Sequence, residues 1–348
     1  MLIIKRHNTD PYFNLATEEY VLKNFDDDSF MLWRNAPSII VGKHQNTLAE
    51  INVDYVKHHN IPVVRRLSGG GAVFHDLGNL NFTFIQKGTE ESLIDFRKYT
   101  LPILEVLQKM GISARFEGRN DLTIDGMKFS GNAEHIWKNR VLHHGTLLFS
   151  SHMPDLAAAL NADPLKFTDK AVKSVRSRVT NISEHLNHPI DVMQFAALIQ
   201  EHITEMYPDA KLVDLTDEDH EKIYELVRNK YNTWEWNFGY SPNYNFKKVV
   251  RTEKSGTIEF DLDVHNGIIQ HIKIFGDYFS KFDTDEIETA LTGTGHNEDA
   301  IVEALKPFNI DYYFAGMKME ELLGGCFKPL SHAVSTRLSA RKTRWLRQ

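Results

Sequence analysis

Residues 65–79 combine fixed positive charge with unusual backbone freedom. The segment reads Arg65-Arg66-Leu67-Ser68-Gly69-Gly70-Gly71-Ala72-Val73-Phe74-His75-Asp76-Leu77-Gly78-Asn79. Three consecutive glycines after an expected strand permit positive φ angles and let a ligand approach backbone N–H groups. Such a concavity suits phosphate or carboxylate oxygens, and the arginine charges do not titrate away. Because the segment matches neither the P-loop nor the dinucleotide-binding pattern of glycines, it predicts an anion site of another kind.

A second cluster surrounds a lysine. Gly118-Arg119-Asn120-Asp121 is followed by Gly126-Met127-Lys128-Phe129-Ser130-Gly131-Asn132-Ala133. A lysine between strand residues and a Ser-Gly turn can hold its ammonium over a site that small residues leave open. The alternative, from this fragment alone, is a surface lysine beside a loop.

Two further clusters carry polar side chains. His143 and His144 are adjacent on an expected strand, so they point to opposite faces. They lack the spacing of a helical zinc-binding pair, which favours buried, hydrogen-bonded histidines over metal ligands. Residues 173–181 are basic and rich in hydroxyl groups, which suits an anion-contacting loop or, equally, a solvated face.

The pattern of apolar residues predicts the elements that carry these clusters. Apolar spacing and turn residues indicate helices over residues 13–22, 99–110 and 192–206, and strands over residues 29–33, 38–42, 62–66, 81–85 and 145–149. Residues 122–128 have the pattern of a hairpin around Asp125-Gly126. The histidines and the lysine are therefore expected on strands, and the glycines on a loop.

The chain is expected to form two domains. Residues 231–246 carry seven aromatic side chains, among them Trp234, Trp236, Phe238, Tyr240 and Tyr244, between Asn, Gly and Pro residues. This composition predicts an irregular connection anchored by its aromatic rings. Beyond it, residues 256–264 and 267–275 predict a hairpin, and residues 283–291 and 297–305 predict two helices. We expect an α/β domain over residues 1–246 and a small α+β domain over residues 247–348.

Composition narrows the class of protein. The chain has 348 residues, a formal net charge of −7 and one cysteine, Cys326. Ordinary composition excludes wholesale disorder, no apolar run reaches the ~18 residues of a membrane span, and a lone cysteine makes no disulfide. We therefore expect a soluble, cytoplasmic protein that binds neither nucleic acid nor membrane. The basic tail at residues 341–347 is interpreted as a solvated end or a contact with an acidic partner.

Taken together, the clusters resemble the lipoate–protein ligases, which attach lipoate to lysines of carrier domains at the expense of ATP. The resemblance covers residues 1–245, and the remainder is similar to the small accessory domain of that family. It is carried by residues 14–19, 32–35, 41–46, 65–79, 118–121, 128–133, 143–148 and 174–181. It implies a catalytic domain with a central mixed sheet of the biotin/lipoyl ligase type. The sequence does not settle the oligomeric state, and a monomer is the default expectation.

The resemblance also implies roles for individual residues. Lys128 would be the catalytic lysine, touching both the lipoyl carbonyl and the α-phosphate. The positions that it assigns to ATP are Arg66, Gly71, Ala72, Val73, Phe74, Asn120, Asp121 and Lys128. Those that it assigns to lipoate are Leu15, Glu19, Trp33, Arg65, Ser68, Gly70, His75, Lys128 and His144. Asp121 is the candidate ligand of Mg²⁺.

The implied reaction has two steps and one principal rival. Lipoate and ATP would give lipoyl-AMP and pyrophosphate, and the acyl group would pass to a lysine of the glycine-cleavage H protein or of a dehydrogenase E2 subunit. The rival is a lipoyl or octanoyl transferase that uses a preformed adenylate or a carrier-bound acyl group. Relatives of the carrier-to-carrier type generally use a cysteine in the acyl-binding domain, and this domain has none. A lipoyl-AMP transferase, a noncatalytic sensor of the same fold and, less favoured, a biotin ligase remain as alternatives.

Overall fold

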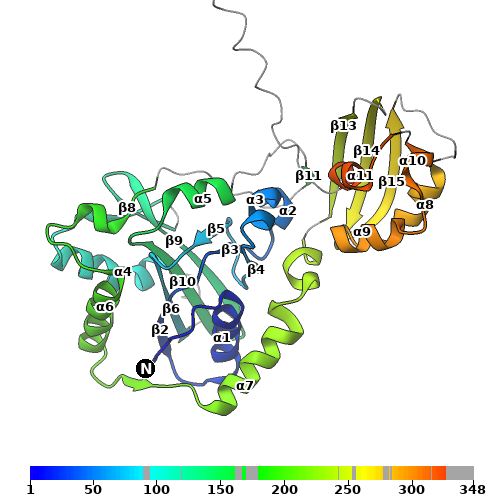
Figure 1. The fold of residues 1–348 in the computed structure, drawn as a ribbon. Helices are drawn as coiled ribbons and strands as arrows, with labels where there is room; N and C mark the ends of the chain where they lie inside the picture. Colours follow the sequence, from blue (N-terminus) through cyan, green and yellow to red (C-terminus); the bar gives the residue numbers. More distant parts are fainter. Residues whose placement is uncertain are drawn as a thin grey trace, which may run out of the picture. The chain divides into compact units, whose positions relative to one another are not determined.

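The computed structural model describes residues 1–88, 95–118, 120–160, 167–169, 179–241, 243–252, 256–276, 282, 284–314 and 316–326. They form two compact units (Figure 1). The first unit contains the chain up to Tyr244 and the second begins at Asn245, apart from short exchanges near residue 167 and at residues 265–267.

A large mixed sheet is the centre of the first unit. Its eight strands have the order β12-β1-β2-β6-β10-β9-β8-β7. The pairs β12–β1 and β1–β2 are parallel, and each later pair is antiparallel. The strands are β1 (Leu2–Ile4), β2 (Ser29–Trp33), β6 (Asn79–Lys87), β7 (Ala114–Glu117), β8 (Asp121–Ile124), β9 (Met127–Trp137), β10 (Arg140–Leu148) and β12 (Lys211–Val213). The expected α/β fold class with a central mixed sheet is confirmed.

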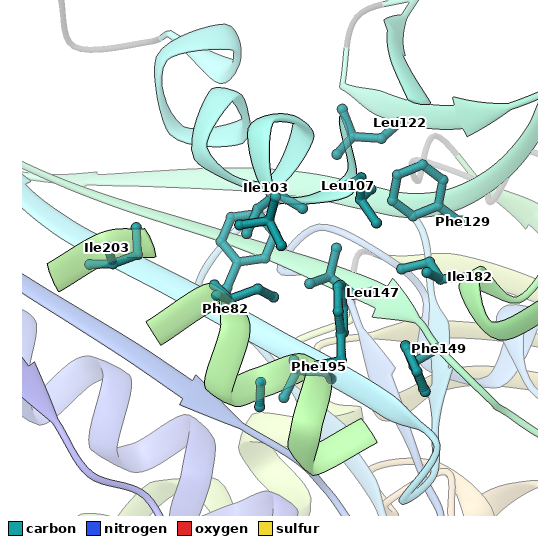
Figure 2. Close-up of a cluster of buried hydrophobic side chains, with 14 of the residues drawn as sticks. Phe82, Ile103, Leu107, Leu122, Phe129, Leu147, Phe149, Ile182, Phe195 and Ile203 are labelled. Atoms are coloured by element: carbon teal, nitrogen blue, oxygen red, sulfur yellow. The ribbon is translucent and has the colours of Figure 1, made fainter. Parts of the chain in front are cut away.

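One face of this sheet carries a hydrophobic layer. Successive strand residues point to opposite faces, and Leu80, Phe82 and Phe84 of β6 all belong to the same buried cluster. The helices α4 (Phe96–Lys109) and α6 (Val192–Met206) cover it, with Ile103 and Phe195 among the packed side chains (Figure 2). The core of the catalytic unit therefore lies on the side of the sheet that β6 fills with phenylalanines.

The other face of the same strands carries polar side chains. Asn81 and Thr83 of β6 alternate with the phenylalanines, and His144 of β10 pairs with Thr83 across the ladder. This side is met by α1 (Pro11–Asn24) and by a small sheet of order β4-β3-β5, comprising β3 (Ser38–Val41), β4 (Val63–Arg65) and β5 (Val73–His75). Polar side chains between the large sheet and the elements that cover it indicate a binding site on this face.

Local signals set the helix that covers the site. Asp10 is the N-cap of α1 and accepts hydrogen bonds from the backbone N–H groups of Tyr12 and Phe13, and Pro11 occupies the first turn. The apolar pattern predicted that the helix begins at Phe13. The helix begins two residues earlier, at Pro11, because Asp10 caps it there. Its companions in the first unit are α2 (Thr47–Glu50), α3 (Val53–His58), α5 (Met153–Ala159), a 3₁₀ turn η2 (Ile182–His185) and α7 (Asp217–Leu226).

The aromatic segment at residues 231–246 differs from the expected irregular connection. Tyr231 ends a π-helical turn, η3 (Val227–Tyr231), and Glu235–Gly239 forms a second one, η4. In η4 the backbone N–H of Tyr240 donates to the carbonyl of Glu235 at 2.6 Å. Because π turns close from i to i+5, they lack the 3.6-residue pattern by which the sequence analysis recognised helices.

The second unit combines a sheet with short helices. Its sheet contains β13 (Tyr244–Thr252), β14 (Gly256–His265) and β15 (Ile268–Gly276) in that order. The short strand β11 (Phe167–Asp169) lies in the segment that the two units share. The expected hairpin is present, and Asn266 and Gly267 at its turn have φ angles of 50° and 73°. The helices are α8 (Asp285–Leu291), α9 (Glu298–Leu305), α10 (Ile310–Tyr313) and α11 (Met319–Cys326). Asp283, the expected start of the first helix, lies outside the described residues.

None of the helices within the described ranges is long and apolar enough to cross a membrane.

Candidate active site

A cavity of about 350 Å³ opens on the polar face of the sheet. The sequence-predicted residues that line it are Leu15, Trp33, Arg66, Gly70, Gly71, Ala72, Val73, His75, Asn120, Asp121, Lys128 and His144. Further lining residues, which the sequence analysis did not name as site residues, are Ile40, Asn81, Gly131, Asn132, Ala133, Gly145 and Thr146. The fold thus brings most of the predicted site residues to one cavity, although they are spread over more than a hundred positions of the chain.

The lysine reaches the cavity from the predicted hairpin. Asp125 and Gly126 turn the chain between β8 and β9 with φ angles of 51° and 73°, conformations that suit Asp-Gly turns. Lys128 Nζ lies 2.8 Å from Asp121 Oδ1 of the neighbouring strand, and both side chains are about a third exposed. A methyl group added at Gly131 would lie 3.0 Å from Nζ. The ammonium therefore lies over a residue without a side chain, the first of the two arrangements that the sequence left open.

Two asparagines hold the strand end that carries Asp121. Asn120 Nδ2 donates to the carbonyl of Asn132 at 2.6 Å, and Asn132 Nδ2 donates to the carbonyl of Asn120 at 3.0 Å. These reciprocal bonds join the start of β8 to β9. They keep the Asp121–Lys128 pair in one place relative to the cavity.

Arg66 organises the glycine loop. Its guanidinium donates to the carbonyls of Gly69 at 2.6 Å and Gly71 at 2.8 Å, and to Ser68 Oγ at 3.0 Å. Gly70 between them has a φ of 89°, which favours glycine. Burial lowers the pKa of Arg66 to about 10, so the group stays charged at neutral pH. The loop is thus folded around a fixed cation at the cavity wall.

A buried polar network joins that loop to Trp33 in the cavity wall. His144 Nε2 and Ser68 Oγ are 2.6 Å apart, and His144 Nδ1 lies 3.0 Å from Glu18 Oε1. The same carboxylate oxygen accepts from Thr83 Oγ1 at 2.6 Å, which in turn accepts from Trp33 Nε1 at 2.8 Å. His144 and Trp33 are thereby held in fixed orientations.

Glu18 was missed by the sequence analysis, which named its neighbour Glu19. Glu19 does not line the cavity; its carboxylate binds Lys23 and Lys230, each at 2.6 Å, and the hydroxyl of Tyr231 at 2.7 Å. Both glutamates lie within one helical turn of the cavity residue Leu15. The helix period alone could not decide which of them faces His144.

Arg65 points away from the cavity, against its assignment to lipoate. Neighbouring residues of an extended chain face opposite ways, and Arg66 takes the cavity side. Arg65 is fully buried and binds seven neutral acceptors: the carbonyls of Gly42, Lys43, Gln45, Trp236 and Asn237 and the hydroxyls of Thr47 and Ser241. Burial lowers its pKa to about 10.

Two other predicted site residues, Ser68 and Phe74, do not line the cavity either. Ser68 makes hydrogen bonds with Arg66 and His144, which do line it, and Phe74 is buried in β5.

The two adjacent histidines separate as expected. His143 lies on the core face, where its Nδ1 is 2.9 Å from Glu134 Oε1 and its ring stacks on Tyr99. Within the described part of the chain no three His, Cys, Asp or Glu side chains gather in a possible metal cluster. Arg119 and most of the basic stretch at residues 173–181 fall outside the described residues, but Thr180 N, at its end, donates to the carbonyl of Lys128 at 3.0 Å.

Comparison with known proteins decides the family. Residues 10–204 match the profile of the lipoyl protein ligase A/B catalytic domain, and residues 241–324 match that of the bacterial lipoate protein ligase C-terminus. The chain is 45% identical over 328 residues to lipoate–protein ligase 1 of Staphylococcus aureus, covering 93% of this chain and 99% of that protein. The chain belongs to the lipoate–protein ligase family. A lipoate–protein ligase of Bacillus subtilis is 42% identical over 93% of this chain and 99% of its own length.

Solved structures of lipoate–protein ligases share the fold. The Plasmodium falciparum protein LipL1, solved in complex with lipoate, is 28% identical, with a TM-score of 0.60 over 88% of this chain and 94% of that one. A lipoate–protein ligase A solved with ATP bound has a TM-score of 0.60 over 69% of this chain and 98% of that one, at 24% identity. The resemblance drawn from the sequence motifs is therefore confirmed.

The close packing of Gly42 against Gly70 allows the contribution of the glycine loop to stability to be tested by mutation. A Cβ at Gly42 would lie 2.0 Å from the carbonyl oxygen of Gly70, so Gly42→Ala must displace the loop. We expect the free energy of unfolding to fall by about 1–3 kcal/mol, measured by urea denaturation. The control is Gly324→Ala in α11, where an added Cβ meets none of the described atoms within 4 Å. Equal stability of the two variants would contradict the tight contact.

Proposed function

We propose that this chain activates lipoate with ATP to form lipoyl-AMP and then transfers the lipoyl group to a lysine of a carrier domain. The observation that carries the proposal is the mixed lining of the cavity. Its wall combines the cations Lys128 and Arg66 and the glycine loop with the apolar side chains of Leu15 and Trp33. A single cavity of this kind accommodates a carboxylate and a phosphate beside each other and an acyl tail beyond them.

The first step brings two anions together. A carboxylate oxygen of lipoate attacks the α-phosphorus of ATP, and the bond to the bridging oxygen of pyrophosphate breaks. Fixed positive charge and N–H donors aimed at the reacting oxygens lower the barrier of such a step. Lys128 Nζ supplies the charge between carboxylate and α-phosphate in this proposal, while Gly70 and Gly71 supply backbone donors. Arg66, bound to the loop carbonyls, adds its charge and keeps the loop in shape.

The second step transfers the acyl group. The deprotonated ε-amine of the carrier lysine attacks the carbonyl carbon of lipoyl-AMP, AMP leaves with the bonding electrons, and the amine loses a proton. Negative charge develops on the carbonyl oxygen, and in this proposal Lys128 stabilises it. The adenylate must also be shielded from water until the carrier arrives. We assign residues 1–246 to the catalytic domain and residues 247–348 to an accessory domain with this protective role.

The donor set is compatible with Mg²⁺ at Asp121. Magnesium is usually held by one or two carboxylates together with substrate phosphates, and Asp121 is a carboxylate about one-third exposed that lines the cavity beside Lys128. Its Oδ1 binds Lys128, which leaves Oδ2 for the metal. Magnesium bound there with ATP would neutralise charge on the departing pyrophosphate.

The proposed carriers are supported by a relative that was studied with its acceptor domain. A ligase of Thermoplasma acidophilum, 25% identical to this chain, was solved as part of a lipoylation system with its E2 lipoyl domain. We propose E2 lipoyl domains and the glycine-cleavage H protein as acceptors of this chain. The deciding experiment is incubation with ATP, Mg²⁺, lipoate and each apo carrier, read by intact mass. A lipoyl mass increase that requires ATP supports the proposal, and an increase only with preformed lipoyl-AMP would support the transferase alternative.

Cys326 separates the ligase from a thioester-forming transferase. It ends α11, is fully buried, and burial raises the pKa of its thiol to about 12, whereas cysteine nucleophiles need an accessible thiolate. We expect Cys326→Ser to retain the transfer rate in the intact-mass assay. Circular dichroism and the smaller change Cys326→Ala control for folding. Loss of transfer in folded Cys326→Ser and Cys326→Ala would contradict the ATP route.

A further inference from the structure

The cavity crosses the sheet from the lysine to a polar patch. Trp33 of β2 pairs with Asn81 of β6, and Asn81 pairs with Thr146 of β10. Thr146 Oγ1 accepts from the backbone N–H of Gly131 of β9 at 3.2 Å, beside Lys128. The steps β2 to β6, β6 to β10 and β10 to β9 span about 14 Å at about 4.8 Å each. An acid with its carboxylate at Lys128 therefore extends its far end toward Trp33 and Asn81.

A relay of buried side chains fixes the proton of His75 at this far end. Arg6 donates to Asn14 Oδ1 at 2.5 Å, and Asn14 Nδ2 donates to Asn35 Oδ1 at 2.9 Å. Asn35 Nδ2 lies 3.1 Å from His75 Nδ1. A guanidinium can only donate hydrogen bonds, so the Asn14 atom that faces Arg6 must be the amide oxygen. The Asn14 amide nitrogen then faces the oxygen of Asn35, and the Asn35 amide nitrogen faces His75. His75 Nδ1 must therefore accept this hydrogen bond. The ring carries its proton on Nε2, at the opposite edge from Asn35.

His75 remains neutral at this position. Burial lowers its pKa to about 3, and electrostatic interaction with the Arg66 guanidinium acts in the same direction. Its side chain is 3% exposed and lies edge-on to Trp33, with ring centroids 6.0 Å apart. The neutral imidazole thus presents one N–H donor next to the indole.

Two donors at the far end lack acceptors. Neither His75 Nε2 nor Asn81 Nδ2 has a hydrogen-bond partner among the described residues. Asn81 is 2% exposed, and its Oδ1 already accepts from Asn79 Nδ2 at 2.9 Å. Buried donors without partners are costly and rare. Where they lie on side chains that line a cavity, they indicate that a bound molecule supplies the acceptors.

We propose that His75 Nε2 and Asn81 Nδ2 form a donor pair that selects acids with acceptor atoms at the end remote from the carboxylate. This inference rests on the proposed function and specifies its substrate. Lipoate carries two ring sulfurs there, which accept hydrogen bonds weakly and make favourable contacts with aromatic rings such as Trp33. Octanoate has the same chain length but ends in a methyl group, so both donors stay unpaired when it binds. The pair favours lipoate over octanoate.

The test compares the two acids in the full chain. Asn81→Leu keeps the size of the side chain and removes the donor. We expect the ratio of kcat/KM for lipoate to that for octanoate, measured by acid-dependent ATP–pyrophosphate exchange, to fall about tenfold. Asn81→Asp, which exchanges the donor for acceptor oxygens, is expected to lower the same ratio. Circular dichroism and thermal unfolding verify that both variants are folded.

A matched control tests whether the change is specific to the donors. Val73→Ala also alters the cavity wall, but removes only hydrocarbon, and is expected to weaken both acids alike. An unchanged ratio in folded Asn81→Leu and Asn81→Asp would overturn the donor pair while leaving the proposed function standing. Absence of exchange with either acid in the unaltered chain would refute the proposed function itself.

Discussion

Lys128→Ala is expected to reduce lipoyl-AMP formation by at least ~100-fold. The change removes the ammonium that the proposed mechanism places between the lipoate carboxylate and the α-phosphate, and water cannot replace a fixed charge in a shaped cavity. Lipoate-dependent ATP–pyrophosphate exchange measures this step without any carrier. Because the same lysine is proposed to stabilise the carbonyl oxygen during transfer, transfer from synthetic lipoyl-AMP should fall as well.

Folding and nonspecific charge effects are separable from this loss. Lys128 is 28% exposed and bound to Asp121 at the cavity wall, so its truncation leaves the hydrophobic core intact. The control Lys109→Ala removes a lysine of α4 that is 59% exposed and paired with Glu205. It should keep normal exchange. Near-normal exchange in folded Lys128→Ala would exclude the assigned role.

Arg65→Leu is expected to lower the free energy of unfolding by about 3–5 kcal/mol. The guanidinium donates to seven acceptors around Gly42–Thr47 and Trp236–Ser241. Leucine leaves these buried oxygens without that donor, and a buried acceptor deprived of its partner is costly. Urea denaturation of the unaltered chain and the variant measures the difference.

Arg65→Lys keeps this prediction testable if the leucine variant fails to fold. An ammonium has three donors and cannot reproduce the planar fork of a guanidinium, so an intermediate loss of stability is expected. Lipoate-dependent exchange by folded Arg65→Lys should retain the KM for lipoate, because Arg65 does not line the cavity. A large rise of that KM with unchanged stability would instead support the assignment of Arg65 to lipoate.

Local sequence signals determined much of the scaffold. Helix α6 coincides with the predicted range because Asp191 and Gln194 form a capping box at its start. The turn at Asp125-Gly126 adopts the positive φ angles that these residue types accept, and this turn sets Lys128 on β9. Such elements depend on interactions between residues a few positions apart, which a single sequence displays.

Tertiary structure alone decided which member of each adjacent pair faces the cavity. Arg65 and Arg66 have the same chemistry, and the choice between them depends on acceptors such as Trp236 and Asn237, more than 170 positions along the chain. Glu18 rather than Glu19 meets His144 because Lys230 and Tyr231 hold the other carboxylate. Strand alternation and helix periodicity fix which side chains share a face. Which face meets the cavity is set by distant segments that pack against it, and no local pattern records that packing.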